Sequence, residues 1–409
     1  MARDQEKHGI SPRIICGSYS GGWLAGLSLK AAQSRLLLEM VLVAHVADVH
    51  LGYAQYGLGE REVDIYEAFE ELVDVIGREK PEILLIAGDL FDSPRPPIRA
   101  LMRARELLGR LRSSGIKIYH VIGDHEIPRR IKDLPPTAIL EKISEHVGLR
   151  NIAIGDDLVI TGLDRVRLSE RDEALRRLGE LAKEARQFRR RILLAHAPLR
   201  GPENIVRDLP KGYSYYALGH EHDRRIFSLD GSAAAYSGSI EILSTAEIDG
   251  WSRSGKGFLL IDLSGDEPII QEVNLGSIRP QKLISVEMNG LESALANVAE
   301  WSSLQRKKPI IHVRVRGRNI DRQLVLRMIQ EKLAGRVLHY RYEVLEELEE
   351  AGEAEEIPAI DVRAIIRDYL VSKGLHEDEA ELAVAIYDAY VSRGIEEVER
   401  LILSRLGER

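Results

Sequence analysis

Between residues 40 and 275, short apolar segments alternate with longer amphipathic segments, and this alternation restricts the possible folds more than any other feature of the chain. The apolar segments have the length of buried strands and lie at residues 41–47, 83–87, 116–122, 158–162 and 192–195. The segments between them have the apolar spacing of helices and lie at residues 63–77, 98–113 and 170–188. The pattern predicts an α/β fold with a layered, two-sheet core flanked by helices.

Three weaker groups of elements follow the alternating region. Shorter β-like stretches at residues 215–218, 233–236 and 257–263 suggest a second sheet packed against the first. A smaller unit then shows strand patterns at residues 283–288, 310–315 and 337–342 and helix patterns at residues 291–301 and 321–333. After Pro358, apolar residues recur at helical spacing on one face, and these are Val362, Ile365, Ile366, Tyr369 and Leu370.

The 409 residues allow roughly two to four domains. We expect a main domain at residues 40–277, a small α+β capping domain at 278–344, an acidic linker at 345–358 and a helical, partner-binding region at 359–409. Residues 1–39 show no sustained period, and we expect a disordered extension or a segment upstream of the true start at Met40.

Composition excludes several classes of protein. The single cysteine, Cys16, rules out an intramolecular disulfide framework and fits a reducing, intracellular compartment. No run of about 18 apolar residues occurs, so no membrane span is expected. The net charge of −8 argues against a basic nucleic-acid coat, although a local basic surface stays possible.

Acidic and histidine residues follow the ends of the predicted strands, where α/β folds bind their ligands. Each fragment alone occurs by chance, but six appear in order, each at a strand end. Carboxylates and imidazoles that converge on one rim bind divalent transition metals, and two such ions polarise a phosphoryl group and acidify a water. Asp89 can bridge two ions through its two oxygens. The fragments are Asp48-Val-His50, Gly88-Asp-Leu-Phe-Asp92, Gly123-Asp-His-Glu126, His196-Ala-Pro198, Gly219-His-Glu-His222 and Tyr236-Ser-Gly-Ser239.

The order of these fragments resembles that of the calcineurin-like metallophosphoesterases. The extended first fragment, which runs from Asp48 through Leu-Gly-Tyr-Ala-Gln-Tyr to Gly57, resembles the SbcD-like nuclease subunits of the double-strand-break repair complex. The resemblance covers about residues 40–345, and the tail is similar only in role to that family's partner-binding helices.

The resemblance implies a nuclease that uses two manganese ions per subunit. By matched position, Asp48, His50, Asp89 and His222 would hold one ion, and Asp89, Asp124, His196 and His220 would hold the other. His125 matches the family's catalytic histidine, which would stabilise developing charge or protonate the leaving sugar oxygen.

Two positions depart from or vary within the family pattern. Asp124 stands where the family usually has Asn. The aspartate still offers an oxygen ligand, but it makes the site less positive by one charge. We expect metal binding to survive this change; the alternative is loss of turnover. Some members have a histidine where Asp92 stands, and others have an aspartate. Asp92 is expected to hydrogen-bond a metal ligand without binding the metal itself.

Partner contacts are expected from residues around the site. Candidates for phosphate contact with DNA ends or single strands are Arg165, Arg167 and basic residues of the small domain, together with Arg95, Arg99, Arg316 and Arg318. Tyr53, just past the first ligands, is a candidate for contact with DNA or with a second subunit. The resemblance also implies a homodimer through helices 63–77 and 98–113. It further implies an SMC-like, coiled-coil ABC-type ATPase that docks on Val362, Ile366 and Leu370.

Two other functions share the same ligands and stay open. One is a small-molecule phosphodiesterase of the same superfamily, and the other is a catalytically weak scaffold that bridges DNA ends. The Leu-Gly-Tyr-Ala-Gln-Tyr extension and the added C-terminal units favour DNA as the substrate.

Overall fold

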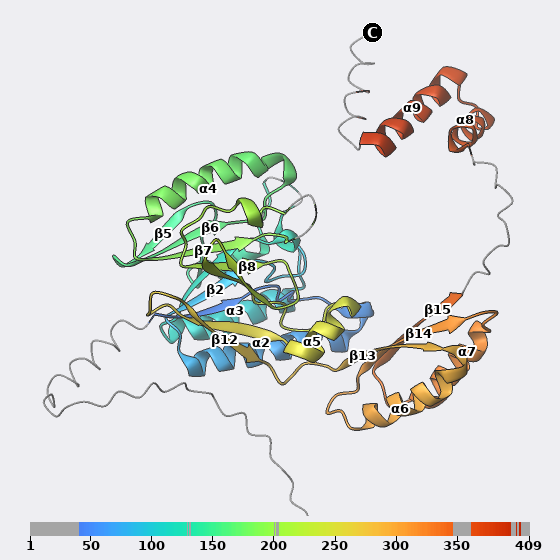
Figure 1. The fold of residues 1–409 in the computed structure, drawn as a ribbon, viewed down its shortest axis with the longest axis horizontal. Coiled ribbons are helices and arrows are strands. Elements are labelled where there is room, and N and C mark those ends of the chain that lie inside the picture. The colour runs from blue at the N-terminus through green and yellow to red at the C-terminus, as the bar shows by residue number, and fades with distance from the viewer. Residues whose placement is uncertain are drawn as a thin grey trace, which may run out of the picture. The chain divides into compact units, whose positions relative to one another are not determined.

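The computed structural model describes residues 41–128, 130, 132–199, 201, 204–346, 361–393, 398 and 401 (Figure 1). The chain divides into two units between Leu345 and Glu346. The expectation for residues 1–39 lies outside the described residues, as does nearly all of the acidic linker expected at 345–358.

Two six-stranded sheets form the main domain within the described part of the chain. The first has the order β12-β11-β1-β2-β3-β4 and comprises Leu42–Val46 (β1), Ile83–Ala87 (β2), Lys117–Val121 (β3), Ser144–His146 (β4), Gly257–Asp262 (β11) and Ile269–Asn274 (β12). The second has the order β5-β6-β7-β8-β10-β9 and comprises Asn151–Ile154 (β5), Leu158–Leu163 (β6), Arg190–His196 (β7), Tyr215–Gly219 (β8), Arg225–Leu229 (β9) and Ser232–Tyr236 (β10).

The alternation of side chains along each strand divides the core into layers. Val43 of β1 and Leu194 of β7 belong to the cluster between the two sheets. Ala44 belongs instead to the cluster on the outer face of the first sheet. The outer face of the first sheet packs on Gly59–Glu79 (α2) and Ile98–Ser113 (α3), and that of the second on Arg171–Ala185 (α4) (Figure 1). The prediction of a two-sheet α/β core flanked by helices is therefore confirmed.

The predicted assignment of strands to sheets is wrong in part. The sequence pattern suggests residues 257–263 for the second sheet, but β11 pairs antiparallel with β1 in the first. Conversely, β6 and β7 pair with each other in the second sheet, apart from β1 to β3. An apolar run shows that a strand is buried, but it carries no information about which neighbour completes its hydrogen bonds.

A third, smaller sheet forms the small domain. Gln281–Glu287 (β13), Ile310–Gly317 (β14) and His339–Glu346 (β15) lie side by side, with β13 and β14 parallel. Leu291–Ser303 (α6) and Arg322–Leu333 (α7) pack with one face of these strands in a core of their own. The predicted order of strands and helices is confirmed here.

The C-terminal unit contains Val362–Ser372 (α8) and Glu377–Arg393 (α9). Asp361 accepts hydrogen bonds from the amides of Arg363 and Ala364 at the start of α8. Gly374, with φ +93°, follows its end, where a left-handed residue closes a helix. None of the helices within the described residues is both long and apolar enough to cross a membrane.

Candidate metal centre

Parallel strands bring the predicted ligands to one rim of the main domain. Because β1, β2 and β3 are parallel neighbours, the residues after their carboxyl ends lie side by side. Strands β7 and β8 are parallel neighbours in the second sheet, and His196 ends β7 while His220 follows β8. Both sheets therefore contribute to the same rim.

The backbone at this rim is strained where the ligands sit. Asp48, His50, Asp89 and His220 all have positive φ, at 52°, 53°, 50° and 106°. A Cβ atom on Gly219 would overlap the carbonyl of Ala87, so the sheets approach each other here through a glycine. Such strain is held in place by surrounding structure and concentrates at functional sites.

Seven predicted ligands fall into two groups joined by one aspartate. In each group the candidate ligand atoms lie within 4.8 Å of one another. The first group is Asp48, His50 and His222, and the second is Asp124, His196 and His220. Asp89 lies within the same distance of His50 and His125 in one cluster, and of Asp48 and His196 in another. This arrangement can hold two cations with a shared carboxylate.

Hydrogen bonds to Nδ1 orient the imidazoles of His196 and His50 so that Nε2 faces the centre. His196 Nδ1 lies 2.8 Å from the carbonyl of Ala87, and its Nε2 lies 3.3 Å from Asp89 Oδ2. His50 Nδ1 lies 3.1 Å from Asp92 Oδ1, while its buried Nε2 has no hydrogen-bond partner among the described residues. A buried nitrogen without a partner, next to carboxylates, fits a metal ligand.

Charge is concentrated and compensated at the centre. Burial would raise the pKa of Asp89, but the imidazoles of His196 and His50 outweigh it and hold that pKa below its ordinary value. Burial likewise opposes ionisation of Asp124, yet its hydrogen bonds to His196 and His220 keep its pKa low. Both carboxylates are therefore anionic and suited to bind cations.

Three side chains support the centre in roles that the sequence did not predict. Glu247 Oε1 lies 3.1 Å from His222 Nδ1, and Lys256 Nζ donates to Glu247 Oε2 at 2.6 Å. Glu126 accepts from two backbone amides, and burial, reinforced by the charge of Asp89, raises its pKa to about 8. The Ser-x-x-Glu pattern at residues 244–247 signals only a helix start, so no local pattern marks Glu247 as a support.

His125 stands at the edge of the centre. Its side chain is 46% exposed and its ring lies 4.6 Å from that of His50. Its Nδ1 lies 2.9 Å from the carbonyl oxygen of Asp92, an acceptor that requires the proton on Nδ1. Nε2 is then the nitrogen available to a substrate.

The other predicted contact residues lie in varied surroundings. Tyr53 is half-buried and donates to the carbonyl of Leu243, and Arg99 stacks over the ring of Tyr66. Arg95 is 81% exposed beside Asp133. Arg316 and Arg318 are exposed on and after β14.

The arginine at position 165, expected to face DNA, contacts the centre instead. Its side chain is only 10% exposed, and its Nε donates to Asp124 Oδ1.

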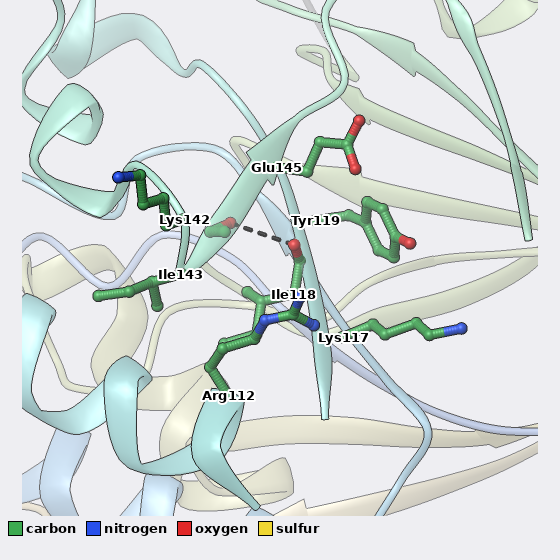
Figure 2. A pocket seen from close by; sticks show the side chains of 8 residues that line it. Arg112, Lys117, Ile118, Tyr119, Lys142, Ile143 and Glu145 are labelled. Atoms are coloured by element: carbon green, nitrogen blue, oxygen red, sulfur yellow. Dashed lines mark hydrogen bonds between the residues drawn. The ribbon is translucent and has the colours of Figure 1, made fainter. Parts of the chain in front are cut away.

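A separate pocket of about 390 Å³ lies at the amino-terminal end of β3, the end opposite the ligands. Figure 2 shows the side chains of Arg112, Lys117 and Lys142 around it, with Tyr119 and Glu145 nearby. Its basic side chains are exposed, and the candidate ligand groups lie elsewhere.

Comparisons with known proteins identify the family of this chain. Residues 41–224 match the family model described as calcineurin-like phosphoesterase. The DNA double-strand break repair protein Mre11 of Sulfurisphaera tokodaii is 35% identical over 71% of this chain and 77% of its own. Its namesake from Methanocaldococcus jannaschii is 30% identical over 86% of this chain and 95% of its own. That from Sulfolobus acidocaldarius is 32% identical over 87% and 96%.

Proposed function

The chain belongs to the Mre11 family of calcineurin-like phosphoesterases, and from that premise we propose that it is a manganese-dependent nuclease. Its reaction would be the exonucleolytic and endonucleolytic hydrolysis of phosphodiester bonds at DNA ends during double-strand-break repair. The observation that carries the proposal is the convergence of seven candidate ligands, Asp89 among them, in neighbouring clusters at one rim. His50 Nε2, which has no hydrogen-bond partner within the described part of the chain, gives this cluster a nitrogen that a metal would satisfy.

The donor set fits two divalent ions. Asp48, His50 and His222 would hold one, Asp124, His196 and His220 would hold the other, and Asp89 would contact both. When bound, the pair supplies Lewis-acid polarisation of the phosphodiester and an acidified water. The carboxylate ligands are of the kind that manganese takes in proteins, whereas the imidazoles are also typical ligands of zinc, iron and nickel.

His125 is placed to act on the leaving group. With Nδ1 bound to the carbonyl of Asp92, the ring is fixed and Nε2 is free to hydrogen-bond the substrate. A protonated Nε2 stabilises charge that develops on the phosphodiester or donates its proton to the departing sugar oxygen. Asp92 also holds His50, so one residue orients a ligand and the proton donor together.

DNA would reach this acidic centre through basic residues around it. Arg95, Arg316 and Arg318 are exposed and able to contact phosphates without reading sequence. Arg99 is exposed too, while half-buried Tyr53 lies three residues past the ligand His50. We infer that the enzyme works inside the cell on duplex ends and single-stranded regions, as a homodimer.

A labelled linear duplex tests this function. The wild-type chain with manganese is expected to shorten the duplex, and His125→Gln to slow cleavage by about 10²- to 10⁴-fold while still binding manganese. His376→Gln, an exposed histidine of the C-terminal unit, is the control and should cleave normally.

The same assay separates the competing functions. Cleavage of bis-p-nitrophenyl phosphate much faster than DNA would favour a small-molecule phosphodiesterase. Normal DNA binding without cleavage in manganese would favour an end-bridging scaffold.

We also propose that the C-terminal unit docks on an SMC-like, coiled-coil ABC-type ATPase. On α8, Val362 is 40% exposed and Tyr369 is 60% exposed, while Ile366 and Leu370 are partly buried. This apolar surface suits a helix-binding partner. Co-purification of such an ATPase with the full chain, but not with a chain lacking residues 357–409, is expected; equal recovery with both would contradict the assignment.

A further inference from the structure

The two oxygens of Asp124 have different surroundings. Oδ2 faces the centre, 2.9 Å from His220 Nδ1 and 3.2 Å from His196 Nε2. Oδ1 faces away from these imidazoles and accepts a hydrogen bond from Nε of Arg165. One oxygen of the Asp124 carboxylate thus contacts candidate metal ligands, and the other contacts the guanidinium of Arg165.

Arg165 is anchored where it meets Asp124. It follows β6, an inner strand of the second sheet, and its own amide donates to the carbonyl of Ile122 at 2.9 Å. The preceding Asp164 accepts a hydrogen bond from the amide of Ile122 at 2.8 Å. Asp164 and Arg165 are therefore both hydrogen-bonded to the backbone of Ile122. The guanidinium also donates to the carbonyl of Val166. With its side chain 10% exposed, Arg165 is poorly placed to reach a DNA phosphate.

The ion pair between Arg165 and Asp124 changes the net charge of the centre. Asp48, Asp89 and Asp124 bring three negative charges to one site. A guanidinium on Asp124 offsets one of them at a partly buried point, where screening is weaker than at the surface. A centre with less negative charge repels an incoming phosphodiester less.

We propose that Arg165 is a positioning residue of the metal centre. It holds Oδ1 so that Asp124 presents Oδ2 alone to the metal side, and it offsets the charge of that carboxylate. Asp124 then contributes to the centre much as a neutral amide oxygen would. The inference rests on the proposed metal-dependent function and assigns a role within that same site.

A double-mutant cycle tests the role, with Arg165→Gln made in the wild-type chain and in the Asp124→Asn variant. Manganese binding is measured by titration calorimetry without DNA, so the readout does not depend on turnover. In the wild-type background, Arg165→Gln is expected to tighten manganese binding by about tenfold, since an uncompensated carboxylate attracts cations more strongly. In the Asp124→Asn background the same substitution is expected to change binding by less than about twofold. Weaker binding, no change, or an equal change in both backgrounds would overturn the proposal.

Control variants separate this role from folding. Arg176→Gln, whose side chain is 59% exposed beside Glu173 on α4, is expected to leave manganese binding unchanged in both backgrounds. Melting in chelator reports whether each variant folds. Should Arg165→Gln not fold, Arg165→Lys keeps the charge and is expected to bind manganese as the wild type does; tenfold tighter binding by the lysine variant would contradict the charge offset.

Failure of this inference differs from failure of the proposed function. A wild-type chain that binds no manganese would overturn both. Manganese-dependent cleavage by the wild type with no coupling in the cycle would overturn the role of Arg165 alone.

Discussion

His45 lies on β1 and its side chain is enclosed between the two sheets. It is fully buried, with Nδ1 2.9 Å from the hydroxyl of Tyr215 on β8. Burial lowers the pKa of His45 to about 3. In the unfolded chain a histidine titrates near about 6.5, so between these values the unfolded state binds the additional proton. Acid therefore destabilises the fold through this residue as the pH falls below about 6.5.

The substitution His45→Gln tests this pH dependence. Well inside the window, the histidine should make the free energy of unfolding fall by about 1.4 kcal/mol for each unit of decreasing pH. The glutamine chain should lose that part of the slope in urea unfolding measured at several pH values. His376→Gln, at an exposed site, should keep the wild-type slope; identical slopes for all three chains would show that His45 does not titrate in this way.

The residues of the centre differ in how far the sequence reveals them. Ligands such as Asp48 and His220 stand in short fragments directly after apolar strands, so their chemistry and their place in the fold are both local information. The supporting groups are not local, because Arg165 reaches Asp124 across 41 positions and Glu247 reaches His222 across 25. A charged residue in a polar stretch looks solvent-exposed until the fold shows what it contacts.

At the scale of elements, α2 connects the main domain to the small domain. Asp64 on α2 is buried and accepts hydrogen bonds from Arg61, Arg279 and Lys307. Burial would raise the pKa of Asp64, but Arg279 and the other cations hold it below its ordinary value. Arg279 and Lys307 lie within residues 278–344, the small domain. Their shared contacts with Asp64 therefore help to fix the small domain against α2.

Asp64→Asn is expected to destabilise the protein by about 3 kcal/mol, because it removes the carboxylate that Arg61 and Arg279 share in a buried network, although Arg61 keeps its contact with Glu241. Denaturant unfolding measures the loss. Asp74→Asn on the same helix is the matched control, since Asp74 pairs with Arg110 at the surface and should cost less than about 1 kcal/mol. Equal losses at both positions would mean that the buried network does not hold the small domain.

The elements themselves followed from the sequence better than their pairing did. Strand β2 and helix α3 have the predicted bounds, because apolar spacing and segment length specify them. Helix α2 begins at Gly59, four residues before the predicted start, because its first turn is rich in charged residues such as Glu60 and Glu62. The pairing of β11 with β1 joins segments about 200 residues apart and depends on the whole fold.

At the scale of the whole molecule, two helices among the described residues expose sets of apolar side chains. One set is on α8 and includes Ile365 and Tyr369, at 56% and 60% exposure. The other is on α3, where Ile98 is 75% exposed and Met102 is 65% exposed. Residues four apart lie on the same helix face, so Ile98 and Met102 form one patch. Apolar patches of this kind mark sites of protein association.

The α3 patch is where we expect two copies of the chain to meet. Leu107 and Leu108 of α3 are buried in the same core cluster as Leu72 of α2, so the helix that carries the patch is held firmly against its neighbour. Met102→Glu would place a charge in an apolar contact and should convert the dimer to a monomer in sedimentation equilibrium at micromolar concentration. Ile269→Glu, at a 69% exposed position on β12, should leave the dimer intact. A wild-type monomer would contradict the expected dimer, and a dimer that survives Met102→Glu would place the contact on another face.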